Sequence, residues 1–423
     1  MAGSLRRLLA RAGGSVTSQA VTAGGSVVLQ LIAVRFLGPE AFGAYAIMMA
    51  VLVAVTTVFS SWVGDSLTVL DRFNPRVRAA LCASILGLTA AGTVVGVVFA
   101  LLLHLADGPG VVAFALLTVL WLPQESARRL LNARLEFGRL VLNDVVYVGV
   151  TLAILAALWL TGTPFTLTWI LGAMCAGQLV SLGLTLALLP SVEYRLPRPS
   201  LAGLGEVTSF AAWRSAQASL RPVALLVMRV AIDTFASRTV LAAVEAGRLL
   251  MSPALTVVQG AGSYLLPTFV RRRDAGVPIR PRNALAASLV LIAGTLACGV
   301  AAIAVLGYAG PLITGGAFTL DAVTVGGWVA YTVSFSATLP LSMMAAAYTL
   351  SRLVFIVRAA ETGIGLTAML VVLAVAPDLA HLAPYCIGFG GLASGFLLWW
   401  HLRRRQAPVP SRNEIPHETH AAE

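Results

Sequence analysis

Lysine is absent from this sequence, and charged residues of every kind make up only 11% of its 423 residues. Soluble globular domains carry about twice that share of charge. Hydrophobic residues account for 58% of the chain, and its mean hydropathy is +0.87. The composition therefore excludes a soluble domain and indicates a membrane protein. Because all 29 basic residues are arginine, GC-rich codon usage and a bacterial source are expected.

Cysteine is also scarce. The chain has four cysteines, and each stands alone inside an apolar run. A disulfide framework or a metal site would need cysteines or histidines at short, repeated spacings. The sequence also lacks a nucleophile–base set and a glycine-rich phosphate loop. We therefore expect no enzyme activity and no resident cofactor or metal.

What the sequence does contain is a series of apolar segments, long enough to cross a hydrocarbon core of about 30 Å. We place about twelve of them, which predicts an all-α, polytopic membrane protein. The segments are 15–36, 41–64, 79–104, 111–125, 143–161, 166–190, 207–231, 237–268, 284–307, 322–347, 353–375 and 379–401. The fourth is short, and the eighth is interrupted by Gly260 and Gly262.

Arginines are distributed unequally between alternate gaps. One set of gaps holds 23 of the 29 arginines, and the other set holds only Arg35 and Arg238. Positively charged residues accumulate on the cytoplasmic side of membrane proteins. The pattern therefore predicts a multi-pass protein of the bacterial cytoplasmic membrane with both termini cytoplasmic. It also accounts for the net charge of +11, so no nucleic-acid partner is expected.

The polar gap near the midpoint contains Pro197 and Pro199. We interpret 191–206 as a cytoplasmic linker between an N-terminal six-helix half, 1–190, and a C-terminal six-helix half, 207–402. The polar tail at 403–423 is expected to be disordered. Weak similarity between 35–45 and 234–244 supports two pseudo-symmetric halves, an architecture that places the ligand in a central cavity between them.

The seventh segment carries Arg214, Arg221, Arg229 and Asp233 within a mostly apolar stretch. Each arginine near the bilayer centre costs about 2.5–3.5 kcal/mol on insertion scales. On an ideal helix the three arginines project from one side, which favours a cationic stripe that faces an internal cavity. In the alternative interpretation the outer two arginines snorkel to the headgroups and Arg221 pairs with a carboxylate.

The stretch Phe36-Leu-Gly-Pro-Glu-Ala-Phe-Gly-Ala-Tyr45 resembles the first external turn of the oligosaccharide and polysaccharide flippases. That family belongs to a superfamily that also contains the multidrug and toxic-compound extrusion antiporters. The polar stretch at 125–144 is similar to the family as well, and the segment plan resembles it over about residues 10–402. The second-half turn, Ala236-Ser-Arg-Thr239, lacks the signature, so the chain resembles a divergent member.

The resemblance implies an alternating-access flippase that moves a polyprenyl-pyrophosphate-linked oligosaccharide for surface polysaccharide assembly. Glycan polymerases and glycosyltransferases of the pathway would be its partners beside the lipid bilayer, and the chain would act as a monomer. Its head-group ligands would be arginines, because guanidinium binds phosphate bidentately. These substrate-binding residues would be Arg214, Arg221, Arg229 and, from the next segment, Arg248. For Arg248 a local pair with Glu245 is the equal alternative.

Buried carboxylates would couple transport to a proton or Na⁺ gradient by alternating between the ion and an arginine. The candidates for ion coupling are Asp65, Asp233 and Glu245. In the alternative interpretation, Asp65 and Asp233 simply lie at segment ends. Asp144 is expected nearer the cytoplasmic face.

Other functions stay open at this point. An ion-coupled small-molecule or multidrug antiporter of the same fold would favour an acidic, aromatic cavity over an arginine-rich one. An integral-membrane glycan polymerase or glycosyltransferase would place its catalytic residues on a large extracytoplasmic loop, and the outer gaps of this sequence are short. A membrane scaffold would not need buried charges.

Overall fold

The computed structural model describes residues 21–404, apart from 72, 135, 191–192, 194–197, 278–279 and 349. The described residues form helices joined by turns and short irregular connections. The predicted all-α class is confirmed. The expected tail beyond Arg404 lies outside the described residues, as do six positions of the predicted linker, 191–192 and 194–197. Residues 204–206 of that linker belong to α9.

In the described part of the chain, ten helices are long and apolar enough to cross a membrane. The first layer of the structure contains the shorter helix Val21–Phe36, α2 (Gly38–Phe59), α3 (Asp65–Val69), α4 (Pro75–Leu102), α5 (Gly108–Ala133), α6 (Phe137–Leu160) and α7 (Leu167–Leu188). The second layer contains α9 (Leu204–Phe235), α10 (Arg238–Asp274), α11 (Pro281–Ala304), α12 (Leu306–Thr314), α13 (Ala322–Ala347), α14 (Ser351–Val375), α15 (Ala383–Gly388) and α16 (Gly391–Arg404).

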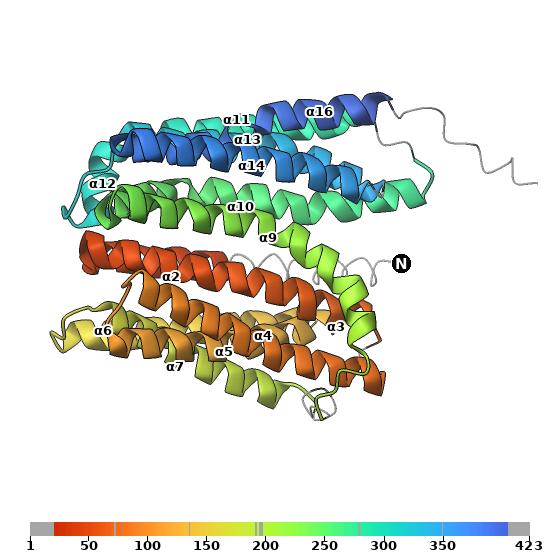
Figure 1. Cartoon of the computed structure of the whole chain (residues 1–423), viewed down its shortest axis with the longest axis horizontal. Coiled ribbons are helices and arrows are strands. Elements are labelled where there is room, and N and C mark those ends of the chain that lie inside the picture. Colours follow the sequence, from red (N-terminus) through yellow and green to blue (C-terminus); the bar gives the residue numbers. More distant parts are fainter. Residues whose placement is uncertain are drawn as a thin grey trace, which may run out of the picture.

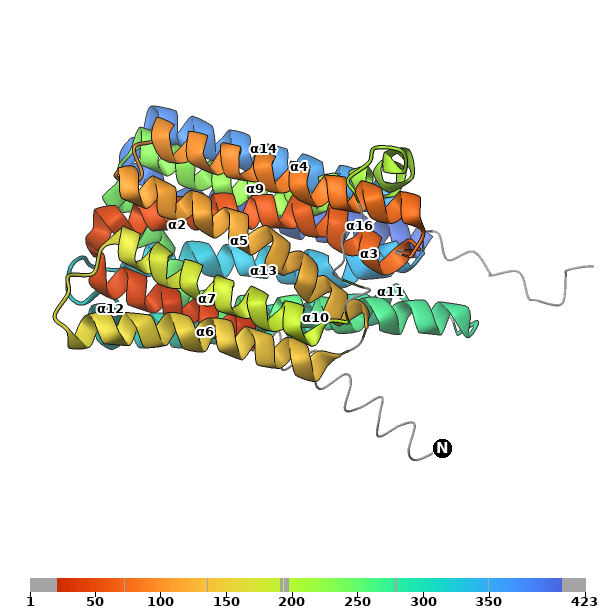
Figure 2. The same ribbon diagram turned by 90° about the horizontal axis from the view of Figure 1, so that it is seen from below.

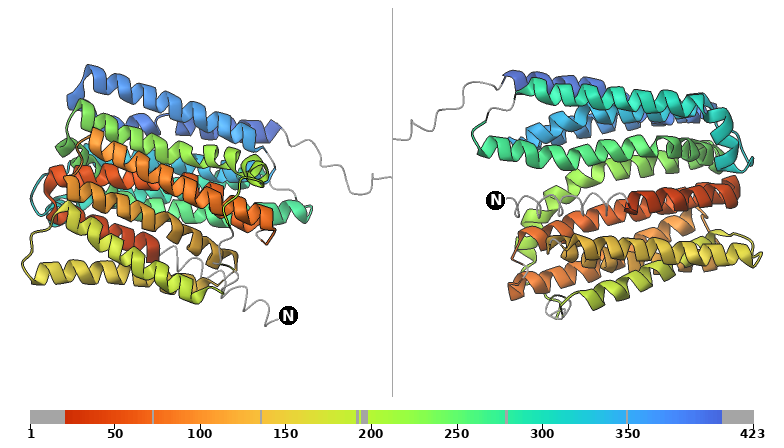
Figure 3. Two further views of the ribbon diagram at one scale, coloured as in Figure 1. Left: turned by 60° about the horizontal axis from the view of Figure 1, so that its bottom comes forward. Right: turned by 180° about the vertical axis from the view of Figure 1, so that it is seen from behind.

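The two halves of the sequence form these two layers (Figure 1). The right-hand view of Figure 3 shows the same separation from behind. Helix α2 packs against both α9 and α10 of the other half. Figure 1 also shows α9 bending as it passes from the first layer to the second, and Pro222 lies inside this helix. Proline removes a backbone donor and favours a bend, so α9 is the physical link between the halves.

Local sequence signals set several helix starts. Five helices begin with a side chain that accepts a hydrogen bond from a backbone N–H of the first turn, and these caps are Asn74, Asp107, Thr166, Ser237 and Asp321. Such caps satisfy donors that have no partner within the helix. Between the first two membrane helices, Gly38 has a φ of +73°, a conformation that glycine adopts easily. The Gly38-Pro39 pair therefore separates these helices, between the predicted segments 15–36 and 41–64.

Several helices extend beyond the predicted segments, α5 and α10 among them. Helix α5 continues to Ala133, so the polar stretch that begins at residue 125 is helical instead of a gap. Helix α10 runs to Asp274 without an interruption at Gly260 or Gly262. Polar and glycine residues weaken a helix only modestly, and tertiary packing can override them. The fourth and eighth segments of the sequence-based plan are therefore too short.

The largest hydrophobic core crosses the boundary between the halves. It includes Phe42 of α2, Met228 of α9 and Trp328 of α13, all nearly inaccessible to solvent. A second core joins the first turns of α9, through Val207 and Ala211, to helices of the N-terminal half. The beginning of α9 therefore packs with one half, while its later part packs with both.

The arginine-rich connections lie at the end of the bundle that also holds α3 and the last turn of α16 (Figure 1). Figure 2 shows α10 extending beyond its neighbours at this end. Between α5 and α6, Glu136 pairs with Arg134 and Arg139. Burial acts to raise the pKa of Glu136, but hydrogen bonds from both arginines outweigh it and hold the pKa below its ordinary value. Ion pairs thus stabilise the connection between α5 and α6.

The orientation expected from the arginine count predicts a labelling pattern. With the four native cysteines replaced, a single cysteine at Tyr308, which is 81% exposed, should react with a membrane-impermeant maleimide in intact cells. A single cysteine at Val277, at the opposite end, should react only after permeabilisation, because the arginine-rich end is expected in the cytoplasm. Labelling of the Val277 position in intact cells would reverse the orientation.

Candidate functional site

The three arginines of α9 have different partners. Arg214, towards the arginine-rich end, forms an ion pair with Asp65 of α3, with 2.7 Å between Nη2 and Oδ2. Its side chain is 53% exposed, and exposed pairs contribute only about 0–1 kcal/mol. The pair joins the two halves through a contact that water can replace at small cost.

Arg229 is buried and binds Glu245 of α10. The guanidinium donates from Nε to Oε1 at 2.8 Å and from Nη2 to Oε2 at 2.9 Å. Arg248 donates to the same carboxylate, with 2.8 Å between Nε and Oε2, and its Nη2 donates to Gln30 Oε1 at 2.6 Å. The local Arg248–Glu245 pair is therefore present, and Gln30 connects this cluster to the N-terminal half.

Arg221 contacts aromatic rings. Its Nε donates to the Tyr331 hydroxyl, and the centre of its guanidinium lies 3.7 Å from the centre of the Phe335 ring. Guanidinium groups are attracted to ring faces, and the attraction grows when both are shielded from water. Arg221 is thus held at the junction of α9 and α13 by a cation–π contact and one hydrogen bond.

Arg358 of α14 belongs to the same cluster and was not selected from the sequence. Its guanidinium centre lies 5.8 Å from the centre of the Phe335 ring. Its Nη2 donates to Ser342 Oγ at 3.5 Å, whereas its Nε is buried without a hydrogen-bond partner in the described structure. Glu361, one turn further along α14, accepts a hydrogen bond from Ser334. Among the described residues, Arg221 and Arg358 have no carboxylate within ion-pair distance.

The predicted stripe is therefore divided among three environments. Neighbouring arginines of the stripe are spaced about 10–12 Å along α9, and they contact α3, α13 and α10 in turn. The snorkelling interpretation is wrong for Arg229, which is 7% exposed, and Arg221 does not pair with a carboxylate. Asp233 pairs with Arg238 at the other end of α9, so Asp65, Asp233 and Glu245 are all bound to arginine. Substrate binding and ion coupling by these residues stay predictions.

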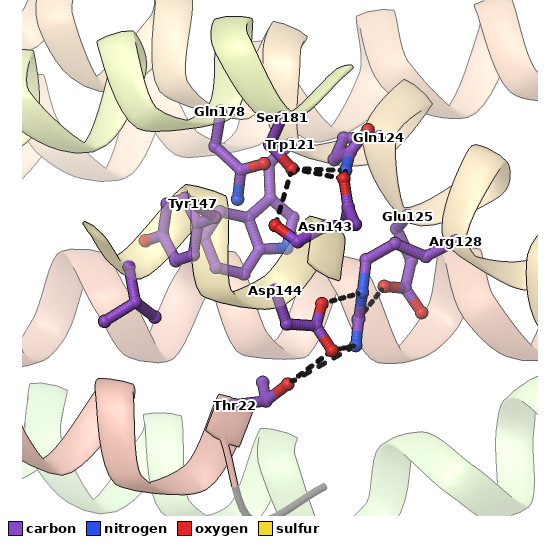
Figure 4. A pocket seen from close by; sticks show the side chains of 11 residues that line it. Thr22, Trp121, Gln124, Glu125, Arg128, Asn143, Asp144, Tyr147, Gln178 and Ser181 are labelled. Carbon is purple, nitrogen blue, oxygen red and sulfur yellow. Dashed lines mark hydrogen bonds and ion pairs between the residues drawn. The ribbon is translucent and has the colours of Figure 1, made fainter. Parts of the chain in front are cut away.

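The N-terminal half contains a charged cluster of its own, around Arg128 (Figure 4). Arg128 of α5 lies between two buried carboxylates: Nη1 donates to Glu125 Oε2 and Nε to Asp144 Oδ1, both at 2.8 Å. Glu125 also accepts hydrogen bonds from Arg129 Nε and Ser60 Oγ. Ser60 begins a π-helical turn, Ser60–Gly64, that follows α2. The two arginines and two carboxylates balance each other in charge.

An uncharged network adjoins this cluster. Asn143 Oδ1 accepts from Gln124 Nε2 at 2.9 Å, from Ser181 Oγ at 2.6 Å and from Thr185 Oγ1 at 2.6 Å. These four side chains come from α5, α6 and α7, and all are buried. Buried polar groups with satisfied partners fix the relative position of their helices, so this network holds three helices in register.

A cavity of about 40 Å³ lies between these helices and Thr22. It has room for about three water molecules. Gln124 Oε1, Gln178 Oε1 and the Tyr147 hydroxyl are buried without a hydrogen-bond partner in the described structure, and all three residues line the cavity. Oxygen atoms of this kind bind water, a hydrated proton or a hard cation. Among the described residues, no group of three or more His, Cys, Asp or Glu could hold a metal ion.

The sequence contains part of the signal for this site. Glu125, Arg128 and Arg129 have the three- and four-residue spacings of helical ion pairs, but the arginine count assigns them to a cytoplasmic connection. Asp144, expected nearer the cytoplasmic face, lies seven residues after the first residue of α6 and is buried. Gln178 reaches this cavity only because α7 packs against α5 and α6. Sequence spacing does not indicate that packing.

No family model and no curated protein matches the sequence. Among solved structures, the chain is similar to an inward-facing multidrug resistance MATE family transporter of the MOP superfamily. The two are 13% identical with a TM-score of 0.66, over 92% of this chain and 96% of that one. An outward-facing MATE family transporter gives a TM-score of 0.59 at 12% identity, over 93% of this chain and 95% of the other.

A MOP superfamily transporter from Pyrococcus furiosus, described as having a binding pocket of reverse polarity that suggests a different function, gives a TM-score of 0.59 at 14% identity. The alignment covers 93% of this chain and 95% of that one. At such identities these likenesses establish the fold alone. The chain therefore has the fold of MOP superfamily transporters, which confirms the predicted polytopic architecture.

The buried charge cluster generates a stability prediction. Glu245→Gln should lower the free energy of unfolding by about 3–5 kcal/mol, because Arg229 and Arg248 would keep their charges without a counter-charge. Thermal unfolding of the detergent-purified protein measures the loss. Arg214→Ala is the matched control, because it removes a half-exposed ion pair and should change stability by about 1 kcal/mol or less.

Adding Arg229→Met to Glu245→Gln should recover part of that stability, since it removes one stranded cation. The contrary result is a double variant whose loss equals the sum of the two single losses, because the two side chains would then act independently.

Proposed function

We propose that this protein is an alternating-access transporter of the bacterial cytoplasmic membrane, and that it moves a polyprenyl-pyrophosphate-linked oligosaccharide during surface polysaccharide assembly. The observation that supports an anionic substrate is the surplus of arginine over carboxylate in the interior of the C-terminal half. The fold of MOP superfamily transporters supports transport. Glycan polymerases or glycosyltransferases that make or use the lipid-linked glycan would be its functional partners.

Two clusters in the C-terminal half carry the surplus of positive charge. In the first cluster Glu245 balances only one of Arg229 and Arg248. In the second, Arg221 and Arg358 share the Phe335 ring, and Glu361 is the nearby acid. Each cluster thus has one positive charge in excess. The charged cluster of the N-terminal half has none, because its two arginines and two carboxylates cancel.

A pyrophosphate head group suits such an arrangement. Phosphate oxygens accept bidentate, charge-assisted hydrogen bonds from guanidinium, which keeps its charge at every physiological pH. An anion that binds beside Arg221 and Arg358 would neutralise the second cluster and satisfy the unpartnered Nε of Arg358. A cationic drug would instead meet like charge, which costs binding free energy.

A small-molecule antiporter is the second candidate. The likeness to multidrug resistance MATE transporters favours it, and so does the balanced, partly aromatic cavity of the N-terminal half. The Pyrococcus furiosus structure has the same fold and a binding pocket described as reversed in polarity. This fold therefore accommodates pockets of either polarity, and the charge of the site is a better guide to substrate than the fold is.

The first test is complementation of a strain that lacks its lipid-linked-oligosaccharide flippase but retains the matching glycan enzymes. Wild type should restore surface polysaccharide. Arg221→Leu should reduce restoration about 10- to 100-fold at equal abundance in the membrane, because one charge-assisted hydrogen bond to phosphate contributes about 1.5–3 kcal/mol.

Arg282→Leu is the matched control, because Arg282 is exposed at the arginine-rich end and its loss should leave restoration unchanged. Full restoration by Arg221→Leu would remove this arginine from the substrate path. If the strain that expresses the wild-type protein becomes resistant to cationic drugs but gains no surface polysaccharide, the antiporter would be supported.

We propose Asp144 as a further candidate for ion coupling, beside Asp65, Asp233 and Glu245. Arg128 holds this carboxylate beside the cavity, and a proton or Na⁺ that binds Asp144 would compete with Arg128. Asp144→Asn should therefore uncouple transport in proteoliposomes, so that an imposed proton or Na⁺ gradient no longer changes its rate. Glu136→Gln, at the arginine-rich end, should keep the gradient dependence. If Asp144→Asn keeps the gradient dependence, Asp144 is not the coupling residue, and Asp65, Asp233 and Glu245 are the remaining candidates.

A further inference from the structure

The only two arginines that the sequence places in the outer gaps both bridge the halves. Arg35, near the end of the helix Val21–Phe36, donates from Nη1 to the carbonyl oxygen of Leu312 at 2.8 Å and, more weakly, to that of Pro311 at 3.4 Å. Both carbonyls belong to α12 of the C-terminal half. A side chain of the first half is thus bound to the backbone of the second.

Arg238 makes the reverse connection. From the first residue of α10, its Nη2 donates to the carbonyl oxygen of Leu103 at 2.7 Å and its Nη1 to that of His104 at 3.1 Å. These carbonyls lie just beyond the end of α4, in the N-terminal half. Asp233 binds the same guanidinium through Nε at 3.0 Å and so fixes its direction.

The two contacts are reciprocal in position. Each arginine lies at the turn between the first and second membrane helices of its own half. Each reaches the connection between the third and fourth membrane helices of the opposite half, at the C-terminal end of α12 or α4. Carbonyls at a helix C-terminus lack partners within the helix and carry the negative end of its dipole. Each guanidinium therefore acts as a helix C-cap across the boundary.

The backbone around both contacts is shaped for close approach. A Cβ on Gly43 would lie 2.5 Å from the carbonyl oxygen of Arg238, so α2 approaches α10 there only because residue 43 is glycine. Gly315, directly after α12, has a φ of +68° and lies against Arg35. His104 has a φ of +48°, unusual for a residue with a side chain, where the chain presents its carbonyls to Arg238.

The hydrogen bonds of Arg35 are exposed, and those of Arg238 are exposed or partly buried. A groove of about 600 Å³, lined by Glu40, Leu105 and Arg238 among others, opens between the halves at this end. The partners of both arginines across the boundary are neutral carbonyls, so breaking the contacts leaves no unpaired carboxylate in the other half. The contacts at this end are thus suited to opening and closing repeatedly.

We propose that Arg35 and Arg238 form a paired outer latch, which holds the extracytoplasmic end closed and releases both helix ends when the protein opens outward. The proposal rests on alternating access, and it adds to the proposed function the residues that set the balance between the two states. Loss of either arginine shifts the resting protein towards the outward-open state, independently of which substrate it carries.

The test measures distances in the full chain, with the native cysteines replaced and no substrate present. Spin labels at Leu160 and Tyr308, which are 77% and 81% exposed, report separation of the halves at the outer end. A second pair at Val69 and Val277 reports the arginine-rich end. Pulsed electron–electron double resonance compares these distances in wild type, Arg35→Gln, Arg238→Gln and the double variant. Arg282→Gln serves as the matched control.

Each single substitution is expected to raise the ratio of open to closed molecules at the outer end about tenfold, and the double variant should raise it about a hundredfold. The distance at the arginine-rich end should shorten in step, while Arg282→Gln gives the wild-type distances. Wild-type distances in both single variants would overturn the latch. A lower melting temperature without any change in distance would also overturn it, because the arginines would then only stabilise the fold.

This outcome is separable from the proposed function. Distances that shift as expected support the latch even where complementation fails, because no glycan enters the measurement. Complementation without any shift in distance leaves the transport proposal standing and removes the latch.

Discussion

The constraint on which this structure depends is the free-energy penalty of placing an arginine in a membrane interior. Every deep guanidinium of the described chain meets a carboxylate, an aromatic ring or a polar group from another helix. These contacts are also the contacts that position helices relative to each other. Arg128 connects α5 to α6, Arg229 connects α9 to α10, and Arg221 connects α9 to α13. The contacts that compensate the buried charges therefore also determine how the helices pack.

The two halves differ in how the charges of their buried arginines are compensated. In the N-terminal half, charges are balanced around Arg128, and an amide network beside them holds α5, α6 and α7 together. In the C-terminal half, Glu245 serves two arginines, and Arg221 relies on ring faces. An interior with excess positive charge attracts an anion, whereas a balanced one does not. This difference is the reason that substrate binding is proposed for the C-terminal half.

The contacts between the halves differ along the membrane normal. Arg214 and Asp65 meet near the arginine-rich end in a half-exposed pair, and Arg248 reaches Gln30 deeper inside. At the opposite end of the bundle, Arg35 and Arg238 bind carbonyls. Each of these bonds is weak enough to exchange with water or a neighbouring group. Helix α9, which packs with both halves and contains Pro222, is continuous across the boundary and so keeps the halves linked while such bonds change.

The sequence by itself determined the membrane class, the approximate number of spans and the Gly38-Pro39 break, because hydropathy, length and glycine or proline backbone preferences act locally. It also singled out Arg35 and Arg238 as exceptions among the outer gaps. Only the tertiary structure decided which groups the arginines meet. Helical spacing places Arg214, Arg221 and Arg229 on one side of α9, yet the partners come from helices whose positions depend on packing across the whole chain. For the same reason the cavity at Asp144 needs Gln178, 34 residues further along the sequence, and local spacing does not indicate that contact.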